Sequence, residues 1–510
     1  MSVKLPLILS RGVVLQRGAE VKLWGKANEP VTVRFLGRQY EASMKADGSW
    51  EAVLSGLEPG GPFTLGINEI TIEDVYVGDV WLCSGQSNIQ MTMQRPKHMY
   101  PWDMEDPNRN IHMFTVPQKT DFNGPQDDVG GGEWLASSPE TIAGFSALGY
   151  FFAKRLNKRY GIPIGLIGCA IGGAPIHCWM SRGALADFPE LFRDTDKFRD
   201  SEYVKREEEK GFEGMKSFAD GIDKDDPGLA EQWYSPGYDD SAWEERDIHE
   251  PWKGTGSVWL RKTLEIPEEL AGKPAELFLG TVNDSDTVYV NGEIVGNTTY
   301  RYPPRDYTIP SLPKGRCVIT ARIISIFGGG FTRDKQYWLS TEEGSFDLSG
   351  AWRFHQGGKG VLTGGPGGMP FHLLPSALYN GMLAPLTRFT IKGALWYQGE
   401  SDAGNAGRYA EKFANLVRGW RKDWGYEFPF LFVELPHWDG GADWHIMRKQ
   451  QRLSLSLPKT AMAAAVDLGE HNDLHPLNKR DIGERLARCA MRVAYGEKLP
   501  PSPFEIVGYK

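Results

Sequence analysis

Cysteine is scarce in this 510-residue chain. The five cysteines are widely spaced and odd in number, which fits neither a disulfide framework nor a zinc site built from paired cysteines. We expect them to be reduced core residues. The N-terminus lacks the basic and apolar regions of a secretion signal. We therefore expect a cytoplasmic protein, or a periplasmic or extracellular one if a leader was removed.

Long apolar runs and clusters of basic residues are also missing. No segment approaches the ~20 apolar residues that a membrane-spanning helix needs, so we expect no membrane insertion. The net charge of −9 disfavours binding to nucleic-acid phosphates or to anionic lipid. At about 100 to 200 residues per domain, the length predicts three or four domains.

The first 75 residues are predicted to form an N-terminal β-sandwich. Short apolar segments at 21–24, 31–35 and 67–70 lie between glycine, proline and aspartate turns. This pattern is typical of short antiparallel strands.

Two stretches, 76–227 and 357–510, alternate strand and helix patterns. In the first, strands at 80–83 and 162–170 flank a helix within 144–160. Such alternation predicts βαβ units and a parallel sheet. The second stretch is expected to contain strands at 391–397, 428–434 and 460–467, with helices at 408–424, 441–455 and 478–495.

Between these two parts, residues 228–356 return to β character. Residues 259–266 alternate in polarity, and Asn291-Gly292 is a strong hairpin signal. One α/β domain is therefore expected to be split by an inserted β-sandwich. The charged run at 202–226 and the glycine-rich run at 357–368 are predicted to be its linkers.

A polar loop with Ser87 follows the strand predicted at 80–83. Gly85 permits an unusual backbone turn, which would present Ser87 with its own N–H free to bind an oxyanion. The alternative is a turn in which the serine only caps a helix.

Two further polar loops follow predicted strands. In one, Gly172 and Gly173 would let backbone N–H groups approach a ligand, although paired glycines also occur in purely structural turns. In the other, Asp473 stands two residues before His475 and can hold the imidazole in the tautomer that accepts a serine proton. The alternative there is a polar surface turn.

A fourth loop carries Gln398 and Glu400. Gln398 can donate a side-chain N–H to an oxyanion, whereas Glu400 can be a structural carboxylate or a glycosidase acid. Because the carboxyl ends of parallel strands meet at one edge of a sheet, the four loops should converge on a common site.

Several motifs of the chain resemble one family. They lie at 13–17, 78–88, 396–401 and 473–476, followed by Lys479. With them the chain resembles, over nearly its whole length, the bacterial sialate O-acetylesterase-like carbohydrate esterases of the SGNH hydrolase superfamily. The resemblance implies a three-layer α/β/α, flavodoxin-like domain, split by an inserted galactose-binding-like jelly roll. We expect that insertion to have a structural or cleft-shaping role rather than to bind sugar.

The resemblance also implies roles for single residues. Ser87 would be the nucleophile, His475 the general base and Asp473 its orienting acid. The N–H groups of Ser87 and Gly173 and the side chain of Gln398 would form the oxyanion hole. Gly172 is the alternative glycine; Asp467 or Glu400 is the alternative acid, unless His475 acts in a dyad without one. Substrate contacts are expected from Gln86, Asn88, His177, Trp179 and Glu400, and Trp438 and Trp444 are further rings able to stack on sugar.

The expected function is the hydrolysis of acetyl esters on sugars through an acyl-enzyme, with an acetylated glycan as partner. This chemistry requires no cofactor and no metal. Sialic acid esters and acetylated hemicelluloses such as xyloglucan are both compatible with the motifs. A glycoside hydrolase and a non-catalytic glycan-binding protein are the alternatives, and the oligomeric state stays open.

Overall fold

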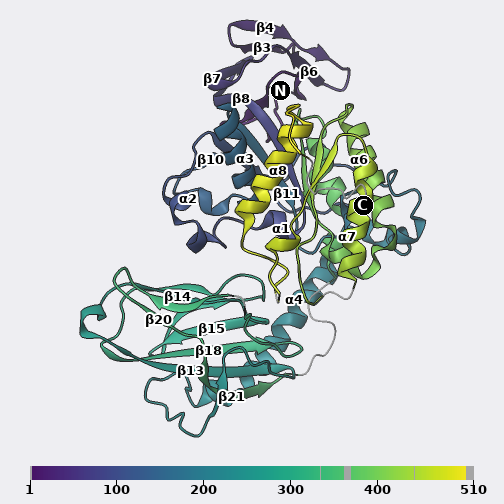
Figure 1. Ribbon diagram of the computed structural model, residues 1–510. Coiled ribbons are helices and arrows are strands. Elements are labelled where there is room, and N and C mark those ends of the chain that lie inside the picture. Colours follow the sequence, from purple (N-terminus) through teal and green to yellow (C-terminus); the bar gives the residue numbers. More distant parts are fainter. Residues whose placement is uncertain (1–2, 334, 361–368, 441–442, 472, 501–510) are drawn as a thin grey trace, which may run out of the picture. The chain divides into compact units, whose positions relative to one another are not determined.

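The computed structural model describes residues 3–333, 335–360, 369–440, 443–471 and 473–500. The chain has a mixed α/β fold with several sheets and forms two compact units (Figure 1). The first unit combines Met1–Arg199 with Phe371–Lys510, and the second is Asp200–Pro370. Among the described helices, none is long and apolar enough to cross a bilayer. All five cysteines are buried and free of disulfides, as predicted.

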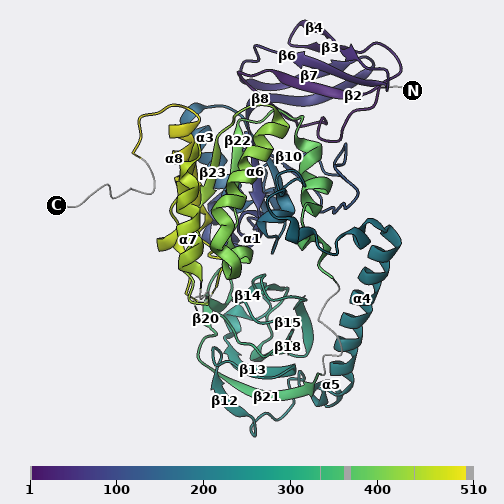
Figure 2. The ribbon, with the colours of Figure 1, turned by 90° about the vertical axis from the view of Figure 1, so that its right-hand side faces the viewer.

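The N-terminal strands lead directly into the central sheet of the first unit. The long strand β8 (Ile70–Gly85) pairs antiparallel with β7 and continues into the parallel sheet, so the boundary predicted at 75 falls inside a strand (Figure 2). The strand predicted at 67–70 is wrong in its centre, because Asn68 at φ 48° turns the chain between β7 and β8. The other N-terminal strands are β1 (Val14–Gln16), β2 (Val21–Lys26), β3 (Thr32–Phe35), β4 (Arg38–Glu41), β5 (Ser43–Met44), β6 (Ser49–Leu54) and β7 (Gly60–Ile67).

A parallel sheet forms the centre of the first unit. Its order is β10-β9-β11-β8-β22-β23-β24, and each neighbouring pair is parallel except β10 with β9. The chain order reverses at β8, and in parallel sheets such a switch point opens a crevice at the carboxyl ends of the strands. Besides β8, the strands are β9 (Ile111–Thr115), β10 (Trp134–Ala136), β11 (Ile164–Ala170), β22 (Gly393–Tyr397), β23 (Phe430–Val433) and β24 (Thr460–Ala463).

Four longer helices accompany this sheet. The helices α3 (Ala147–Tyr160) and α8 (Lys479–Val493) pack on each other, and α6 (Tyr409–Trp424) packs on α7 (Trp444–Leu453). Each lies within three residues of its predicted bounds, although positions 441–442 of the predicted 441–455 helix are outside the described residues. Two short helices, α1 (Ser87–Gln90) and α2 (Pro101–Glu105), precede α3.

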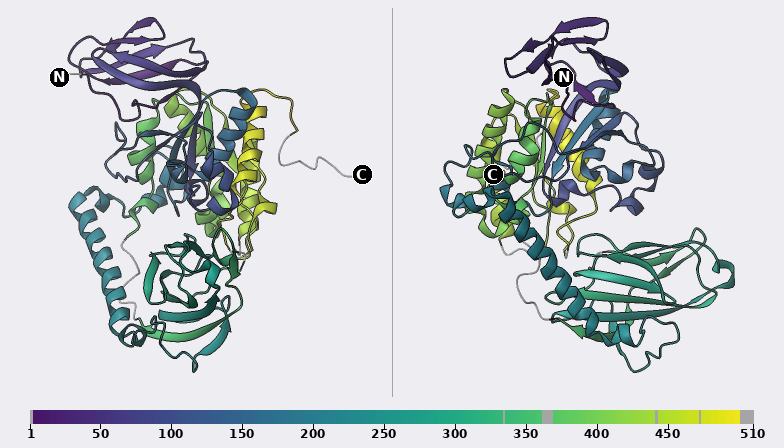
Figure 3. Two further views of the ribbon diagram at one scale, coloured as in Figure 1. Left: turned by 90° about the vertical axis from the view of Figure 1, so that its left-hand side faces the viewer. Right: turned by 180° about the vertical axis from the view of Figure 1, so that it is seen from behind.

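The second unit consists mainly of strands (Figure 3). They form two antiparallel sheets, with orders β12-β21-β13-β18-β15-β16 and β17-β14-β19-β20. Asn291 and Gly292 form the predicted hairpin turn between β15 and β16, with φ of 47° and 89°. The strands are β12 (Glu244–Asp247), β13 (Gly256–Ile266), β14 (Ala275–Leu279), β15 (Ser285–Val290), β16 (Glu293–Thr298), β17 (Asp306–Ile309), β18 (Gly315–Ser325), β19 (Tyr337–Ser340), β20 (Ser345–Asp347) and β21 (Ala351–Lys359).

The two predicted linkers can be compared with the structure to different extents. The charged run forms the 24-residue helix α4 (Ser201–Lys224), followed by the short α5 (Pro227–Ala230). Asp200 caps α4, and the glutamates and lysines that suggested a linker also have high helix propensity. The glycine-rich run begins inside β21, and its residues 361–368 lie outside the described part of the chain.

Candidate active site

The side chains of Ser87 and His475 meet although they stand 388 positions apart in the chain. Ser87 Oγ lies 2.8 Å from His475 Nε2. The serine begins α1 directly after β8, and the histidine lies in the loop between β24 and α8. His475 is only 1% exposed, whereas Ser87 is partly exposed. The hydroxyl is therefore open to a ligand while its proton acceptor is shielded from water.

The turn between β8 and α1 requires a glycine. Gly85 has φ 130°, and a Cβ there would lie 2.2 Å from the carbonyl oxygen of Tyr397 in β22. The backbone N–H of Gln86 donates to the same oxygen at 3.0 Å. Ser87 is the first residue of α1, and no side chain caps this helix. The alternative of a capping serine is therefore wrong.

Asp473 lies beside the imidazole of His475. Its Oδ1 accepts the backbone N–H of His475 at 2.8 Å and lies 3.4 Å from His475 Nδ1. Its Oδ2 lies 3.3 Å from a guanidinium nitrogen of Arg95, a residue that the sequence analysis missed. The alternative acid Asp467 instead makes two 2.6 Å hydrogen bonds with Arg485. Of these two aspartates, only Asp473 is placed beside the histidine.

Burial keeps His475 uncharged at neutral pH. Loss of solvation lowers the pKa of the imidazole to about 4, while the carboxylate of Asp473 acts in the opposite direction. A neutral imidazole is the form that can accept a proton from the serine. The imidazole of His475 is therefore in its neutral form at neutral pH.

Two backbone N–H groups near Ser87 are available to an oxyanion. Within the described part of the chain, the N–H groups of Ser87 and Gly173 donate to no acceptor of the protein. The N–H of Gly172 donates to Gln90 Oε1 at 2.7 Å. Gly173, rather than Gly172, is therefore the glycine with a free donor.

The predicted oxyanion role of Gln398 is not supported by its contacts. The side chain is fully buried, and its Nε2 donates to Asp402 Oδ2 at 2.7 Å and to the carbonyl oxygen of Ala174 at 3.4 Å. Both amide hydrogens are thus engaged. Asp402 Oδ2 also accepts the backbone N–H of Ile176 at 2.8 Å. Gln398 and Asp402 together brace the loop that contains Gly173.

Asn88 joins three loops instead of facing a substrate. Its side chain is fully buried and donates to Glu400 Oε1 at 2.5 Å and to the carbonyl oxygen of Leu474 at 2.9 Å. Its Oδ1 accepts from Lys479 Nζ at 2.6 Å. The contacts of Asn88 do not support the predicted substrate contact, because each of its polar atoms is used within the protein.

Other predicted substrate contacts are buried as well. Trp179 is fully buried and Trp444 is 3% exposed, so neither ring can stack on a sugar. Gln86 is 2% exposed, and its Oε1 accepts the N–H of Ser401 at 3.3 Å. Trp438 is partly exposed and stays a prediction.

His177 and Glu400 also stay predictions. His177 is partly exposed, and its Nε2 lies 3.0 Å from the carbonyl oxygen of Leu373. In the described structure, Glu400 Oε2 has no hydrogen-bond partner, and burial raises the pKa of this carboxyl. In each side chain one buried polar atom, His177 Nδ1 or Glu400 Oε2, has no hydrogen-bond partner within the described residues.

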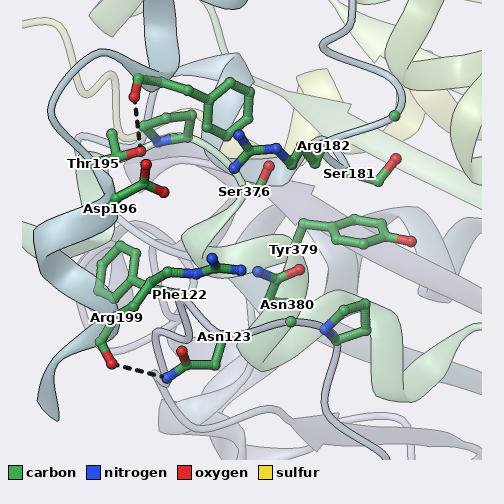
Figure 4. A pocket seen from close by; sticks show the side chains of 15 residues that line it. Phe122, Asn123, Ser181, Arg182, Thr195, Asp196, Arg199, Ser376, Tyr379 and Asn380 are labelled. Carbon is green, nitrogen blue, oxygen red and sulfur yellow. Dashed lines mark hydrogen bonds between the residues drawn. The ribbon is translucent and has the colours of Figure 1, made fainter.

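A cavity of about 360 Å³ lies in the same unit and is shown in Figure 4. Its wall includes Ser376, whose N–H donates to the carbonyl oxygen of His177 at 3.0 Å. Neither Ser87 nor His475 lines it. The wall combines aromatic, charged and amide side chains, among them Phe122, Asn123, Arg182, Phe192, Asp196, Arg199, Tyr379 and Asn380.

Comparisons with known proteins point in one direction. A profile of the family described as "Carbohydrate esterase, sialic acid-specific acetylesterase" matches residues 77–205 and 366–492. The sialate O-acetylesterase of Rattus norvegicus is 24% identical over 540 residues, which covers 95% of this chain and 72% of the rat protein. The sialate O-acetylesterase of Homo sapiens is 30% identical over 204 residues, covering 35% of this chain and 38% of the human protein. A crystal structure of a carbohydrate acetylesterase from Xanthomonas citri has a TM-score of 0.59 and 25% identity, covering 98% of this chain and 76% of that one.

Proposed function

Because this chain belongs to the sialic acid-specific acetylesterase family of carbohydrate esterases, we propose that Ser87 and His475 are the groups with which it hydrolyses acetyl esters on sugars. The observation that carries the proposal is the 2.8 Å distance between Ser87 Oγ and His475 Nε2, beside the N–H groups of Ser87 and Gly173. Such an arrangement suits acyl transfer from an ester to a serine.

The reaction would proceed in two steps. Ser87 Oγ attacks the acetyl carbonyl carbon while His475 Nε2 takes the hydroxyl proton, and the N–H groups of Ser87 and Gly173 stabilise the oxyanion. The sugar oxygen then leaves with the proton from His475, so that acetyl-Ser87 remains. Water, deprotonated by His475, attacks the acetyl group and releases acetate, and the proton returns to Ser87. Asp473 orients the imidazole throughout.

The arrangement of carboxylates supports an esterase over a glycoside hydrolase. Asp473 lies against His475, and Glu400 Oε1 accepts from Asn88. A glycosidase requires two carboxyl groups facing one bond, about 5 to 9.5 Å apart. Here the carboxylates of Asp473 and Glu400 instead accept hydrogen bonds from neighbouring groups of the protein.

The finer fold assignment is also a proposal. The sheet order with its switch at β8, and the helix pairs α3–α8 and α6–α7, support a three-layer SGNH, flavodoxin-like domain within the first unit. The two antiparallel sheets of the second unit support a jelly roll at 228–356.

The substrate is proposed to be an acetylated glycan, with sialic acid and hemicellulose esters as the candidate classes. The cavity beside His177 has aromatic and polar walls of the kind that bind sugars, and we assign it to the sugar or to the chain attached to it.

The test is acetate release from a panel of acetylated glycans and from an aryl acetate. Ser87→Ala should lower kcat/KM for every substrate by at least about 10³-fold. Ser401→Ala is the matched control, because this exposed serine lies near the site and its side chain has no assigned role. Undiminished hydrolysis by a folded Ser87→Ala protein would show that another nucleophile does the chemistry.

A further inference from the structure

Three metal-binding side chains converge in the first unit, outside the acyl-transfer site. His437 and Asp439 follow β23, and His471 follows β24. His437 Nε2 lies 3.2 Å from His471 Nδ1 and 2.8 Å from Asp439 Oδ1. His471 Nδ1 lies 3.3 Å from Asp439 Oδ2. The donor atoms of the three residues thus face one point.

Two of these separations, 3.2 and 3.3 Å, are close to the edges of a metal coordination shell, and the 2.8 Å contact between His437 and Asp439 is shorter. Zinc binds imidazole nitrogen and carboxylate oxygen at about 2.0 to 2.2 Å, so neighbouring ligands of a tetrahedral ion stand about 3.3 Å apart. The two imidazole nitrogens lie 3.2 Å apart, near this spacing, and in the tautomers that leave both nitrogens unprotonated both lone pairs are available to one ion. Two imidazoles with one carboxylate are a ligand set that suits zinc, nickel or copper.

The backbone holds the two loops in this arrangement. The N–H of Asp439 donates to the carbonyl oxygen of His471 at 2.9 Å, and the N–H of His437 donates to that of Val466 at 3.2 Å. A Cβ on Gly469 would lie 2.1 Å from the carbonyl oxygen of His437, so the close approach of the loops depends on this glycine. Ligands fixed by their loops need little ordering when a metal binds.

We propose that His437, Asp439 and His471 bind one divalent transition-metal ion of the zinc type, with water completing its shell. The ion would join the loop after β23 to the loop that carries Asp473 and His475. Its role is structural: it takes no part in the proton transfers, and the proposal stands apart from the catalytic assignment. All three ligands are at least partly exposed, so the ion can exchange with solvent.

Calorimetric titration of the EDTA-treated, tag-free full chain with zinc chloride tests the site. We expect one zinc per chain. His437→Ala and His471→Ala should each weaken binding by at least about tenfold, since even residues behind the ligands contribute about that much. His445→Ala is the matched control, because this exposed histidine is outside the cluster and should leave the affinity unchanged. Absence of zinc binding by the wild type, or equal affinity in His437→Ala and the control, would overturn the site.

Hydrogen exchange tests the joining of the loops. Zinc should slow exchange of backbone amides around His475 in the wild type and have no effect in His471→Ala. If the wild-type protein is folded and binds zinc, but its loop around His475 exchanges equally fast with and without zinc, the structural role is wrong. Circular dichroism of each variant shows whether it is folded.

Discussion

Buried charges are handled differently in the two units of this chain. In the second unit, Arg305 and Asp286 are fully buried and form a 2.5 Å hydrogen bond. The guanidinium also donates to the carbonyl oxygens of Arg301, Pro303 and Asp284, and the other oxygen of Asp286 accepts from a tyrosine hydroxyl at 2.6 Å. The pair is surrounded by partners on every side, as a stabilising buried pair must be.

The first unit buries ionisable groups around Ser87, next to a side chain that is itself partly exposed. Burial lowers the pKa of His475 to about 4 and that of Lys479 to about 7, and it raises the pKa of Glu400. Perturbed groups of this kind gather at sites of chemistry. Burial also raises the pKa of Asp286, so the comparison rests on contacts: the Arg305–Asp286 pair lies wholly inside the protein, whereas His475 meets a partly exposed serine.

The largest effect is expected from His475→Gln. Removal of the base should lower kcat for acetate release by about 10⁴-fold or more, because the serine proton then has no acceptor. The melting temperature should stay the same or rise, since a poorly solvated imidazole is removed. Steady-state kinetics and a thermal melt measure both. If His475→Gln instead lowers the melting temperature and leaves kcat of the folded protein unchanged, His475 serves stability and not catalysis.

Arg305→Met should have the opposite outcome. Leaving Asp286 buried without its partner should cost about 3 to 5 kcal/mol in the free energy of unfolding, with kcat of the folded protein unchanged. Urea unfolding followed by fluorescence measures the loss. The matched control is Arg305→Met with Asp286→Leu, which should recover part of the stability because no charge stays unpaired. A single variant as stable as the wild type contradicts this account of the second unit.

Asp473→Asn should have an intermediate effect on catalysis. We expect kcat/KM to fall by about a hundredfold, less than for an ideally placed acid, because Oδ1 lies 3.4 Å from His475 Nδ1. Asp467→Asn is the control and should keep its rate, since that carboxylate is bound to Arg485. If kcat/KM falls equally in both variants, Asp473 has no special role in orienting His475.

The smallest effect concerns the pH profile. The pKa of His475 lies below that of a free histidine, so the ring stays neutral, and active as a base, until the pH falls towards about 4. The acid limb of kcat/KM for an aryl acetate should therefore lie between pH about 4 and 5, and not near 6.5. Activity should be full above this window and lost below it. An acid limb at or above pH 6.5 would contradict the burial argument.

Sequence patterns predicted much of the fold and the centre of the site. Regular apolar spacing placed α3, α6 and α8, and the glycine before Ser87 marked the turn after β8. Partners distant in the sequence were beyond such patterns. No pattern of neighbouring residues indicates that Arg95 contacts Asp473. The same holds for the hydrogen bonds of the Asn88 side chain with Glu400 and Lys479. Burial of Trp179 likewise depends on the packing of elements far apart in the chain.

Covalent trapping of the nucleophile tests the central claim most directly. A fluorophosphonate reacts with a serine that an adjacent histidine activates, and peptide mass mapping then locates the adduct. We predict one adduct per chain, on Ser87, with labelling strongly slowed in His475→Gln. An adduct on any other residue, or no labelling of an active preparation, would contradict the pairing of Ser87 with His475.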